Sequence, residues 1–518
     1  MVRCDAGTWR NAGPPMNAPS SINQLHARRL GLLSQHEAVA LVHVDCPICR
    51  SEGVSAHSRV TLTSGGKSII ATLYQVSADW LATNTIGLSE TAWTGLGLDD
   101  KGEVTVTHSP PVLSLSFVRQ RIFDDGLNER QISSIVRDIV SGAYSDIHLA
   151  AFVTAISARP LSDGEVTSLT RAMIETGDQT EWDEKTVVDK HCVGGLPGNR
   201  TTPIVVAIVA AHGLLIPKTS SRAITSPAGT ADTMEVLTRV DLSGDEMRKV
   251  VRQTGGCFVW GDGVGFSPAD TDIIRVERAL NFDAPGTMVA SVLSKKIAAG
   301  STHIVIDMPV GPTAKVKNVV EARQLSNVFD TVASAFGIHL RIEITDGSQP
   351  VGRGIGPALE ARDVLAVLGN EPNAPADLLE KSCVLAGAIL ELAGIAQPGE
   401  GKSMAEDTIA NGKAWAKFLA ICDAQGGLRE LPEAKYKRPI YAPFNGRVAS
   451  INNRKLARAA KLAGAPDDKA AGLDLKVRLG DQVCQGEALF VLHTETIGEL
   501  TYVLDYVHAN PDIIELTH

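Results

Sequence analysis

Two glycine-rich segments of the sequence contain the residue types that bind phosphate. The first runs from Val188 to Pro203 (VDKHCVGGLPGNRTTP) and holds three glycines together with Lys190. Glycines let a backbone approach a ligand closely, and a proline such as Pro203 suits the first turn of a helix. The free N–H groups and the dipole at a helix N-terminus favour an anion. This segment therefore predicts an anion site, with Lys190 as its positive charge.

The second segment, from Lys218 to Thr230 (KTSSRAITSPAGT), supplies five Ser and Thr hydroxyls before Thr230, and Arg222. Hydroxyls donate to phosphate oxygens, and an arginine can bind them with two N–H groups. One loop of this kind is more often a tight turn than a binding site. Two of them after neighbouring strands, each with a cation, favour phosphate binding.

Four strings of the sequence together resemble the thymidine and pyrimidine-nucleoside phosphorylases, in the type 2 branch close to the AMP phosphorylases. They are DKHCVGG (189–195), PKTSSRAITS (217–226), AGTADTME (228–235) and ASVLSKK (290–296). The resemblance extends from about residue 21 to about residue 515. It implies a helical domain facing an α/β domain, a C-terminal β domain, and a homodimer or a higher oligomer. It also implies phosphorolysis, in which inorganic phosphate is the co-substrate and no cofactor or metal takes part.

The resemblance assigns roles to individual residues. The positions that match phosphate-contacting residues are Lys190, Gly195, Thr202, Ser220 and Thr230, and the same cradle is lined by Ser221, Arg222, Ala223, Ile224, Thr225 and Ser226. Ser291 and Lys295 match positions that contact the base or substrate, and Lys315 matches a nucleotide-contacting lysine. Two candidates for the proton donor to the leaving base stay open, His191 and Asp283.

Each of these roles has a plain structural alternative. His191 could cap the end of a strand, and Asp283 lies in the sequence NFDAP, which is typical of a turn. Lys295 and Lys296 could form the solvated face of a helix. The base-binding arginine of the pyrimidine enzymes also has two candidates, Arg275 and Arg278.

The substrate stays open because the sequence departs from the pyrimidine pattern. Cys192 stands where the pyrimidine enzymes usually carry serine, and a thiol is a weak donor to phosphate. The first hypothesis is phosphorolysis of thymidine to thymine and 2-deoxyribose 1-phosphate, and the alternative is AMP, giving ribose 1,5-bisphosphate. A different enzymatic alternative is a phosphoribosyltransferase, which would need magnesium for its pyrophosphoryl substrate. The non-enzymatic alternative is a scaffold protein that binds phosphate or a nucleotide.

The elements that must position these residues follow from the hydrophobic pattern. Strand-like and helical runs alternate through the centre of the chain, which predicts an α/β fold: a mainly parallel sheet flanked by helices, plus a small helical domain, an N-terminal β domain and a C-terminal α+β or β domain. The expected divisions are a flexible tail (1–20), a β-rich domain (21–110), a helical domain (111–180), the phosphate-binding catalytic domain (181–432) and a C-terminal β-rich domain (433–518). Strands are expected at 186–189 and 214–218, and a helix at 203–212. Ligands bind at the carboxyl ends of such strands.

Composition excludes several other classes. The 518 residues include 49 basic and 59 acidic side chains, a formal net charge of −10, which argues against a nucleic-acid partner. The eight cysteines are too sparse for a disulfide scaffold and fit a cytoplasmic protein, and the single C-x-x-C at Cys46–Cys49 lacks the second pair that structural zinc needs. The longest apolar run, Ile204–Ala211, is too short to span a membrane, so no membrane role is expected.

Overall fold

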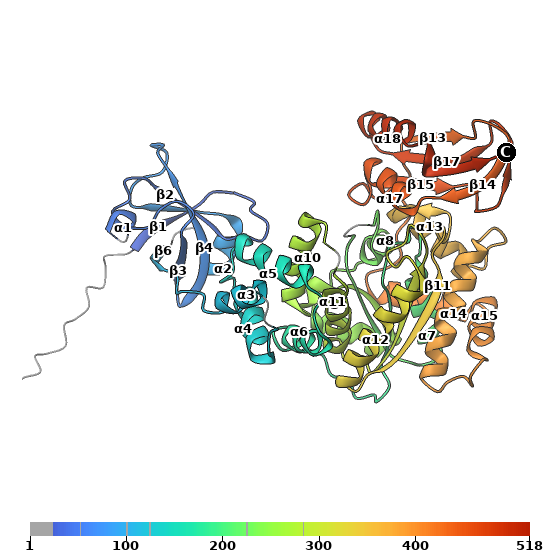
Figure 1. Cartoon of the computed structure of the whole chain (residues 1–518), viewed down its shortest axis with the longest axis horizontal. Helices are drawn as coiled ribbons and strands as arrows, with labels where there is room; N and C mark the ends of the chain where they lie inside the picture. The colour runs from blue at the N-terminus through green and yellow to red at the C-terminus, as the bar shows by residue number, and fades with distance from the viewer. Residues whose placement is uncertain (1–23, 52, 100–101, 124–125, 224–225, 283) are drawn as a thin grey trace, which may run out of the picture. The chain divides into compact units, whose positions relative to one another are not determined.

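The structure is a computed structural model that describes residues 24–51, 53–99, 102–123, 126–223, 226–282 and 284–518. The chain divides into two compact units between Leu113 and Ser114. Each unit is described separately, and their elements are labelled in Figure 1.

The first unit is a closed six-stranded barrel with the strand order β1-β5-β2-β4-β3-β6. Its strands are β1 (Gln24–Arg29), β2 (Val39–His43), β3 (Arg59–Ser64), β4 (Lys67–Val76), β5 (Thr85–Leu88) and β6 (Glu103–His108), and its helices are α1 (Pro47–Ser51) and α2 (Glu90–Leu96). Alternating residues such as Val60 and Leu62 fill the interior, as strands with one buried face require. The N-terminal β domain predicted from the sequence is therefore present.

The second unit begins with a helical bundle. Its helices are α3 (Leu115–Ile122), α4 (Glu129–Val140), α5 (Asp146–Ala158) and α6 (Asp163–Glu175), and α10 (Pro268–Leu280) and α11 (Pro285–Ala298) pack against them. Capping boxes at Asn128, Ser145 and Ser162 start α4, α5 and α6, because each side chain accepts a hydrogen bond from a backbone N–H of the first turn. The bundle thus includes two helices from much later in the chain.

A parallel sheet forms the centre of this unit. The strands are β7 (Val188–Cys192), β8 (Ile216–Ser220), β9 (Gly256–Trp260), β10 (His303–Val310) and β11 (His339–Asp346). They pair in parallel in the orders β11-β10-β7 and β8-β9, and a parallel bridge between Val187 and Leu215 joins the two groups. The predicted mainly parallel α/β fold is confirmed.

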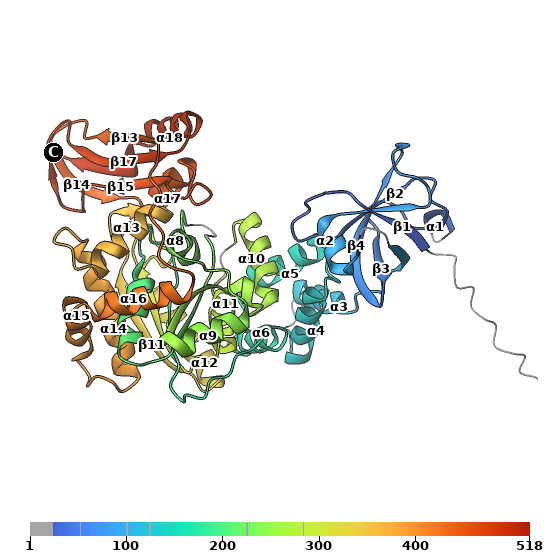
Figure 2. The ribbon, with the colours of Figure 1, turned by 180° about the vertical axis from the view of Figure 1, so that it is seen from behind.

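Helices cover this sheet (Figures 1 and 2). They are α7 (Thr201–Ala211), α8 (Thr230–Leu237), α9 (Gly244–Thr254), α12 (Val319–Ala335), α13 (Pro357–Leu368), α14 (Ala376–Leu392), α15 (Gly401–Ala410) and α16 (Lys413–Ala424), with a 3-10 turn η1 at Gly261–Val264. Helix α7 contains the longest apolar run and is buried on every side, which explains why it carries no polar face. No described helix combines the length and apolarity of a membrane span.

The strand boundaries differ from the sequence prediction in a way that matters for the site. Strand β7 does not end at Asp189 but continues through Lys190 and His191 to Cys192, and β8 continues to Ser220. Polar residues can extend β7 because strand pairing uses backbone hydrogen bonds and does not depend on the side chain. Val305 of β10, for example, pairs with Lys190 of β7. Of the predicted site residues, Lys190, His191 and Ser220 therefore lie on strands and not in loops.

The C-terminal region is an α+β domain. It contains the antiparallel sheet β12-β15-β17-β13 and the smaller sheet β16-β14-β18. The strands are β12 (Gly354–Ile355), β13 (Tyr436–Tyr441), β14 (Gly446–Ile451), β15 (Gly472–Leu475), β16 (Gln482–Val483), β17 (Ala488–Thr494) and β18 (Ile514–Thr517), and the helices are α17 (Asn453–Leu462), α18 (Ile497–Ala509) and the 3-10 turn η2 (Pro511–Ile513).

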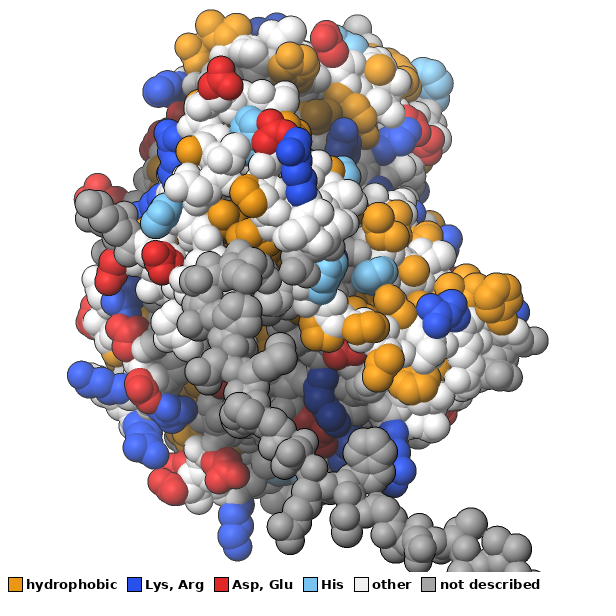
Figure 3. All heavy atoms as spheres, turned by 90° about the vertical axis from the view of Figure 1, so that its left-hand side faces the viewer, with side chains coloured by type: hydrophobic (Ala, Val, Ile, Leu, Met, Phe, Trp, Pro, Cys, Tyr) orange, Lys and Arg blue, Asp and Glu red, His pale blue; other side chains and the backbone are white. Residues whose placement is uncertain are grey.

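The surface carries charges of both signs. On the face drawn in Figure 3, Lys and Arg side chains alternate with Asp and Glu side chains among the described residues. This face therefore carries the mixed charge expected from the composition.

Candidate active site

Lys190 brings a buried positive charge to the start of helix α7. Its side chain is 1% exposed, and its Nζ lies 2.7 Å from the Thr201 hydroxyl and 3.5 Å from the Thr202 hydroxyl. Burial lowers the pKa of Lys190, and the negative charge of Asp307 works in the opposite direction. The lysine, the two hydroxyls and the first turn of α7 together form a set of donors for an anion.

Gly195 fits its position only because it lacks a side chain. Its φ is +81°, and a Cβ at this residue would lie 2.3 Å from the backbone nitrogen of Lys315. The glycine-rich loop and the segment of Lys315 are therefore in direct backbone contact. The structure thus brings together Gly195 and Lys315, two predicted site residues that are 120 positions apart in the sequence.

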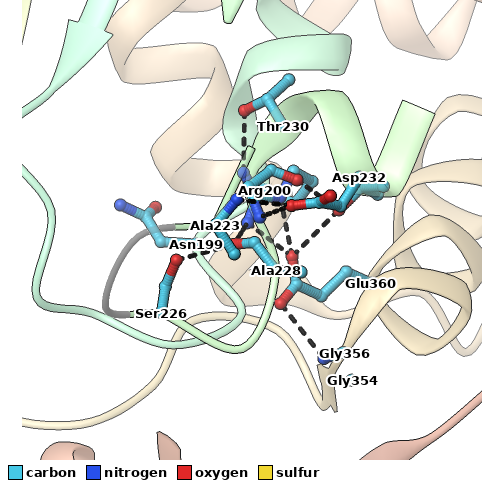
Figure 4. A network of polar contacts seen from close by, with 12 residues as sticks. Asn199, Arg200, Ala223, Ser226, Ala228, Thr230, Asp232, Gly354, Gly356 and Glu360 are labelled. Atoms are coloured by element: carbon cyan, nitrogen blue, oxygen red, sulfur yellow. Dashed lines mark hydrogen bonds and ion pairs between the residues drawn. The ribbon is translucent and has the colours of Figure 1, made fainter. Parts of the chain in front are cut away.

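Arg200 joins the two glycine-rich segments (Figure 4). Its guanidinium donates to the Thr230 hydroxyl at 2.7 Å and to the Ala228 carbonyl at 2.8 Å. On its other side it pairs with the buried carboxylate of Glu360 at 2.6 Å, and Glu360 also accepts from the Gly356 backbone at 3.2 Å. Burial raises the pKa of Glu360, and the Arg200 charge opposes this effect.

Arg200 and Glu360 were not among the site residues predicted from the sequence. The available signal was the position of Arg200 inside the glycine-rich motif, whereas Glu360 lies 160 residues away and no pattern pointed to it. Through this pair, the loop before α7 and the loop before α8 are held as one structure.

The second loop is fixed by carboxylates. Asp232 accepts from the backbone N–H groups of Ala223 at 2.6 Å and Gly229 at 2.8 Å. Arg222 donates twice to Glu235, both at 2.7 Å, and its guanidinium lies 4.8 Å from the centre of the Trp260 ring. The Arg222 charge is thus neutralised by Glu235 in the structure.

The hydroxyl groups of this loop differ in their surroundings. Ser220, at the end of β8, has a buried hydroxyl without a hydrogen-bond partner among the described residues, so it is available to a ligand. Ser226 donates to the Ala228 carbonyl at 2.9 Å. Ser221 is exposed, and Ile224 and Thr225 lie outside the described residues.

A buried charge cluster lies beside His191 at the strand ends. The Asp189 carboxylate lies 3.3 Å from Lys218 Nζ and 2.8 Å from Lys296 Nζ. Both lysines also donate to the Thr219 carbonyl, at 2.5 Å and 3.1 Å. Burial, and then the charges of Lys296 and Lys218, hold the pKa of His191 well below its usual range. His191 is therefore a neutral imidazole near pH 7, able to donate one hydrogen bond.

The two lysines of α11 are not a solvated face, so that structural alternative is wrong. Lys296 is 2% exposed and belongs to the charge cluster. Lys295 lies 2.5 Å from the buried carboxylate of Asp270 on α10. Ser291 is half-buried on the same helix, one turn before Lys295.

The remaining candidates lie near the helical bundle. Arg275 forms an ion pair with Asp146 of α5 at 2.8 Å, whereas Arg278 is exposed at the end of α10. Arg278 is thus the less constrained of the two arginines considered for the base. Asp283 lies outside the described residues.

The Cys192 side chain accepts two hydrogen bonds from the glycine-rich loop. Its sulfur accepts from the Asn199 amide at 3.2 Å and from the Gly194 backbone at 3.4 Å. The same amide donates to Asp307 at 3.0 Å. Burial, with the nearby Asp307 charge, raises the pKa of Cys192 to about 11, so the thiol stays neutral. Its role in the structure is to anchor the glycine-rich loop.

No group of three or more His, Cys, Asp and Glu side chains able to hold a metal occurs in the described part of the chain.

A helical bundle joined to a parallel sheet, with a lysine- and hydroxyl-lined anion site at its strand ends, is the arrangement of a glycosyl transferase. The chain matches the family models described as glycosyl transferase family, helical bundle domain (residues 118–177), glycosyl transferase family, a/b domain (184–415), and pyrimidine nucleoside phosphorylase C-terminal domain (447–513).

Curated relatives cover nearly the whole chain. A "Putative thymidine phosphorylase" from Chelativorans sp. (strain BNC1) is 57% identical over 95% of this chain and 97% of its own length. A "Putative thymidine phosphorylase 2" from Acidovorax sp. (strain JS42) is 54% identical over 99% and 98% of the two chains. The chain belongs to this family of glycosyl transferases. Among solved structures, an anthranilate phosphoribosyltransferase from Thermus thermophilus aligns with a TM-score of 0.49 and 20% identity, over 60% of this chain and 98% of that one.

Proposed function

We propose that the protein catalyses phosphorolysis of a nucleoside, with inorganic phosphate as co-substrate and without a cofactor or metal. The observation that carries the proposal is the joining of two strand-to-helix turns by Arg200, beside the buried cation of Lys190. This arrangement offers one oxyanion the lysine, the Ser220, Thr202 and Thr230 hydroxyls and the helix dipole of α7.

The reaction breaks the C1′–N bond and forms a C1′–O bond to phosphate. The transition state resembles an oxocarbenium ion, so an anionic nucleophile held in line lowers its energy. The electrons of the broken bond stay on the base, which needs a proton or a hydrogen bond to leave. Ser291, Lys295 and Lys315 are proposed to contact the nucleoside, and the Ser221–Ser226 loop to line the phosphate.

The donor to the base remains a choice between His191 and Asp283. The neutral imidazole can donate a hydrogen bond to a carbonyl of the base, whereas a carboxyl group could transfer a proton. Asp283→Asn should lower kcat far more than substrate affinity if Asp283 is the donor. Wild-type activity in this variant would assign the role to His191.

The relatives' names favour thymidine as substrate, giving thymine and 2-deoxyribose 1-phosphate, and AMP is the alternative. Base release should be measured from thymidine and AMP side by side, with and without phosphate, in the presence of EDTA. Phosphate-dependent release in EDTA supports phosphorolysis and excludes a magnesium-dependent phosphoribosyl transfer. Binding of nucleoside or phosphate without release from either compound would instead support the scaffold alternative.

We also propose a cytoplasmic homodimer that pairs through the helical bundle. Phe123, just after α3, and Ile147 in α5 are 82% and 81% exposed, which is unusual for large apolar side chains in a monomer. Light scattering should give twice the chain mass for the wild type. Phe123→Asp should shift it toward the monomer, while an unchanged mass would place the contact elsewhere.

A further inference from the structure

We propose that helix α17 of the C-terminal domain carries a second anion site that binds a phosphomonoester group. The site is distinct from the Lys190 cradle. Its position relative to the substrate rests on the proposed function, but its existence does not, because ligand binding can be measured without turnover.

Three basic side chains form one stripe on α17. Arg454, Arg458 and Lys461 recur at intervals of four and three residues, so they lie on the same helix face. The opposite face carries Leu456 and Ala459, which are buried in the core of the C-terminal domain. The stripe is therefore directed away from that core.

The first turn of α17 docks on the segment that contains Lys315. The Asn453 backbone donates to the Thr313 hydroxyl at 3.2 Å, and its amide donates to the Gly347 carbonyl at 2.9 Å. Arg454 donates to the Ala314 carbonyl at 3.3 Å. The next residue, Lys315, is in backbone contact with Gly195. The stripe thus starts beside the glycine-rich loop of the candidate active site.

The far end of the stripe lies near a fourth basic residue, Arg278 of helix α10 in the helical bundle. Lys461 is half-buried; burial, and then the charges of Arg278 on α10 and Arg458, lower its pKa. No described acidic side chain forms an ion pair with Arg278, Arg454 or Arg458 within the described ranges. The positive charges of these three arginines repel one another unless a counter-anion joins them.

This concentration of positive charge stands out in a chain whose net charge is −10. A phosphomonoester carries about 1.5 to 2 negative charges near pH 7 and three strong acceptor oxygens, which suit the planar donors of two arginines. The group could belong to the substrate, as the 5′-phosphate of a nucleotide whose sugar lies at the cradle. It could also belong to a separate phosphorylated metabolite. Both sources present the same chemistry to the stripe.

The test compares substrate pairs that differ only in the 5′-phosphate. Base release should be measured with AMP against adenosine and with thymidine 5′-monophosphate against thymidine, for the wild type, Arg458→Gln and Arg278→Gln. Lys455→Gln is the matched control, because Lys455 lies on the same helix but pairs with Asp512. Calorimetry should measure binding of AMP, adenosine and ribose 5-phosphate to each protein.

For a 5′-phosphate in the substrate, the preference for the phosphorylated member of a pair should fall by at least about tenfold in both stripe variants and stay unchanged in Lys455→Gln. For a separate metabolite, ribose 5-phosphate binding should weaken by a similar factor in Arg458→Gln, while this variant keeps its turnover of thymidine. An equal loss for both members of a pair, or unchanged binding and preference, would overturn the site. If the wild type releases no base at all, the proposed function fails, and the binding of AMP against adenosine still decides whether the stripe binds a phosphomonoester.

Discussion

Replacing Gly195 with alanine should damage the candidate active site much more than the same change at Gly194. Both residues have a positive φ, +81° and +93°, so alanine is strained at each. A Cβ at Gly194 would meet nothing within 4 Å, whereas one at Gly195 would lie 2.3 Å from the Lys315 nitrogen and 2.7 Å from its Cβ. The pair of variants therefore separates backbone strain from the close approach to Lys315.

The magnitudes follow from these distances. The backbone strain costs about 1 kcal/mol at either position. Non-bonded atoms need a separation of about 3.5 Å, so the glycine-rich loop or the Lys315 segment must move by about 1 Å in Gly195→Ala. Such overpacking adds about 1–3 kcal/mol. A displacement of about 1 Å at a catalytic site can cost about 100-fold in rate.

The assay combines thermal unfolding with phosphate-dependent base release. Gly194→Ala should lose about 1 kcal/mol of stability and keep most of its activity, and Gly195→Ala should lose about 2–4 kcal/mol and at least about tenfold in kcat/KM. Equal losses of activity in the two variants would refute the reasoning. The contact with Lys315 would then have no part in shaping the site.

Three further variants test other contacts. Lys190→Ala should raise the KM for phosphate and lower kcat strongly, as measured by initial rates over a phosphate series; an unchanged phosphate dependence would remove Lys190 from the site. Hydrogen bonds from Arg222 lower the pKa of Glu235 to about 2, so this carboxylate stabilises the fold above pH 4.5 and the contribution is lost as the pH falls toward 2. Denaturant unfolding should show that Glu235→Gln lowers the free energy of unfolding by about 1–2 kcal/mol at pH 7, after allowance for partial solvent screening, and by almost nothing at pH 2. The same loss at both pH values would contradict a stabilisation that depends on the ionised carboxylate. Cys192→Ser should keep activity near wild type, because the serine oxygen can also accept from Asn199, and a large gain would show that the thiol limits phosphate binding.

The fold could be predicted because its determinants are local. Alternating strand-like and helical runs indicate a parallel sheet, and the capping residues mark where helices begin. A helix was predicted at residues 203–212, and α7 (Thr201–Ala211) is that helix. The C-terminal domain was expected to be α+β or β, and its helices were not located in the sequence because glycine-separated strands dominate that region, although the stripe and apolar face of Asn453–Leu462 have a helical period.

The charge network could not be predicted because it joins residues far apart in the chain. Arg200 pairs with Glu360, which is 160 residues away in the sequence, and Asp189 pairs with both Lys218 and Lys296. Composition favours solvated lysines, so Lys296 was not expected inside the protein. The structure buries it because a carboxylate and a carbonyl replace its hydration.

These buried charges explain how an acidic chain can attract an anion. Lys218 and Lys296 share the single carboxylate of Asp189, and Lys190 and Lys381 share the single carboxylate of Asp307. The strand ends therefore keep a surplus of positive charge, and burial prevents water from screening it. Burial first, and then the same surplus of positive charge, lower the pKa of His191, since another cation beside these lysines would be repelled. A bound phosphate would offset the positive charge of the lysines and so raise the pKa of His191. Binding of the anion and protonation of His191 should therefore favour each other.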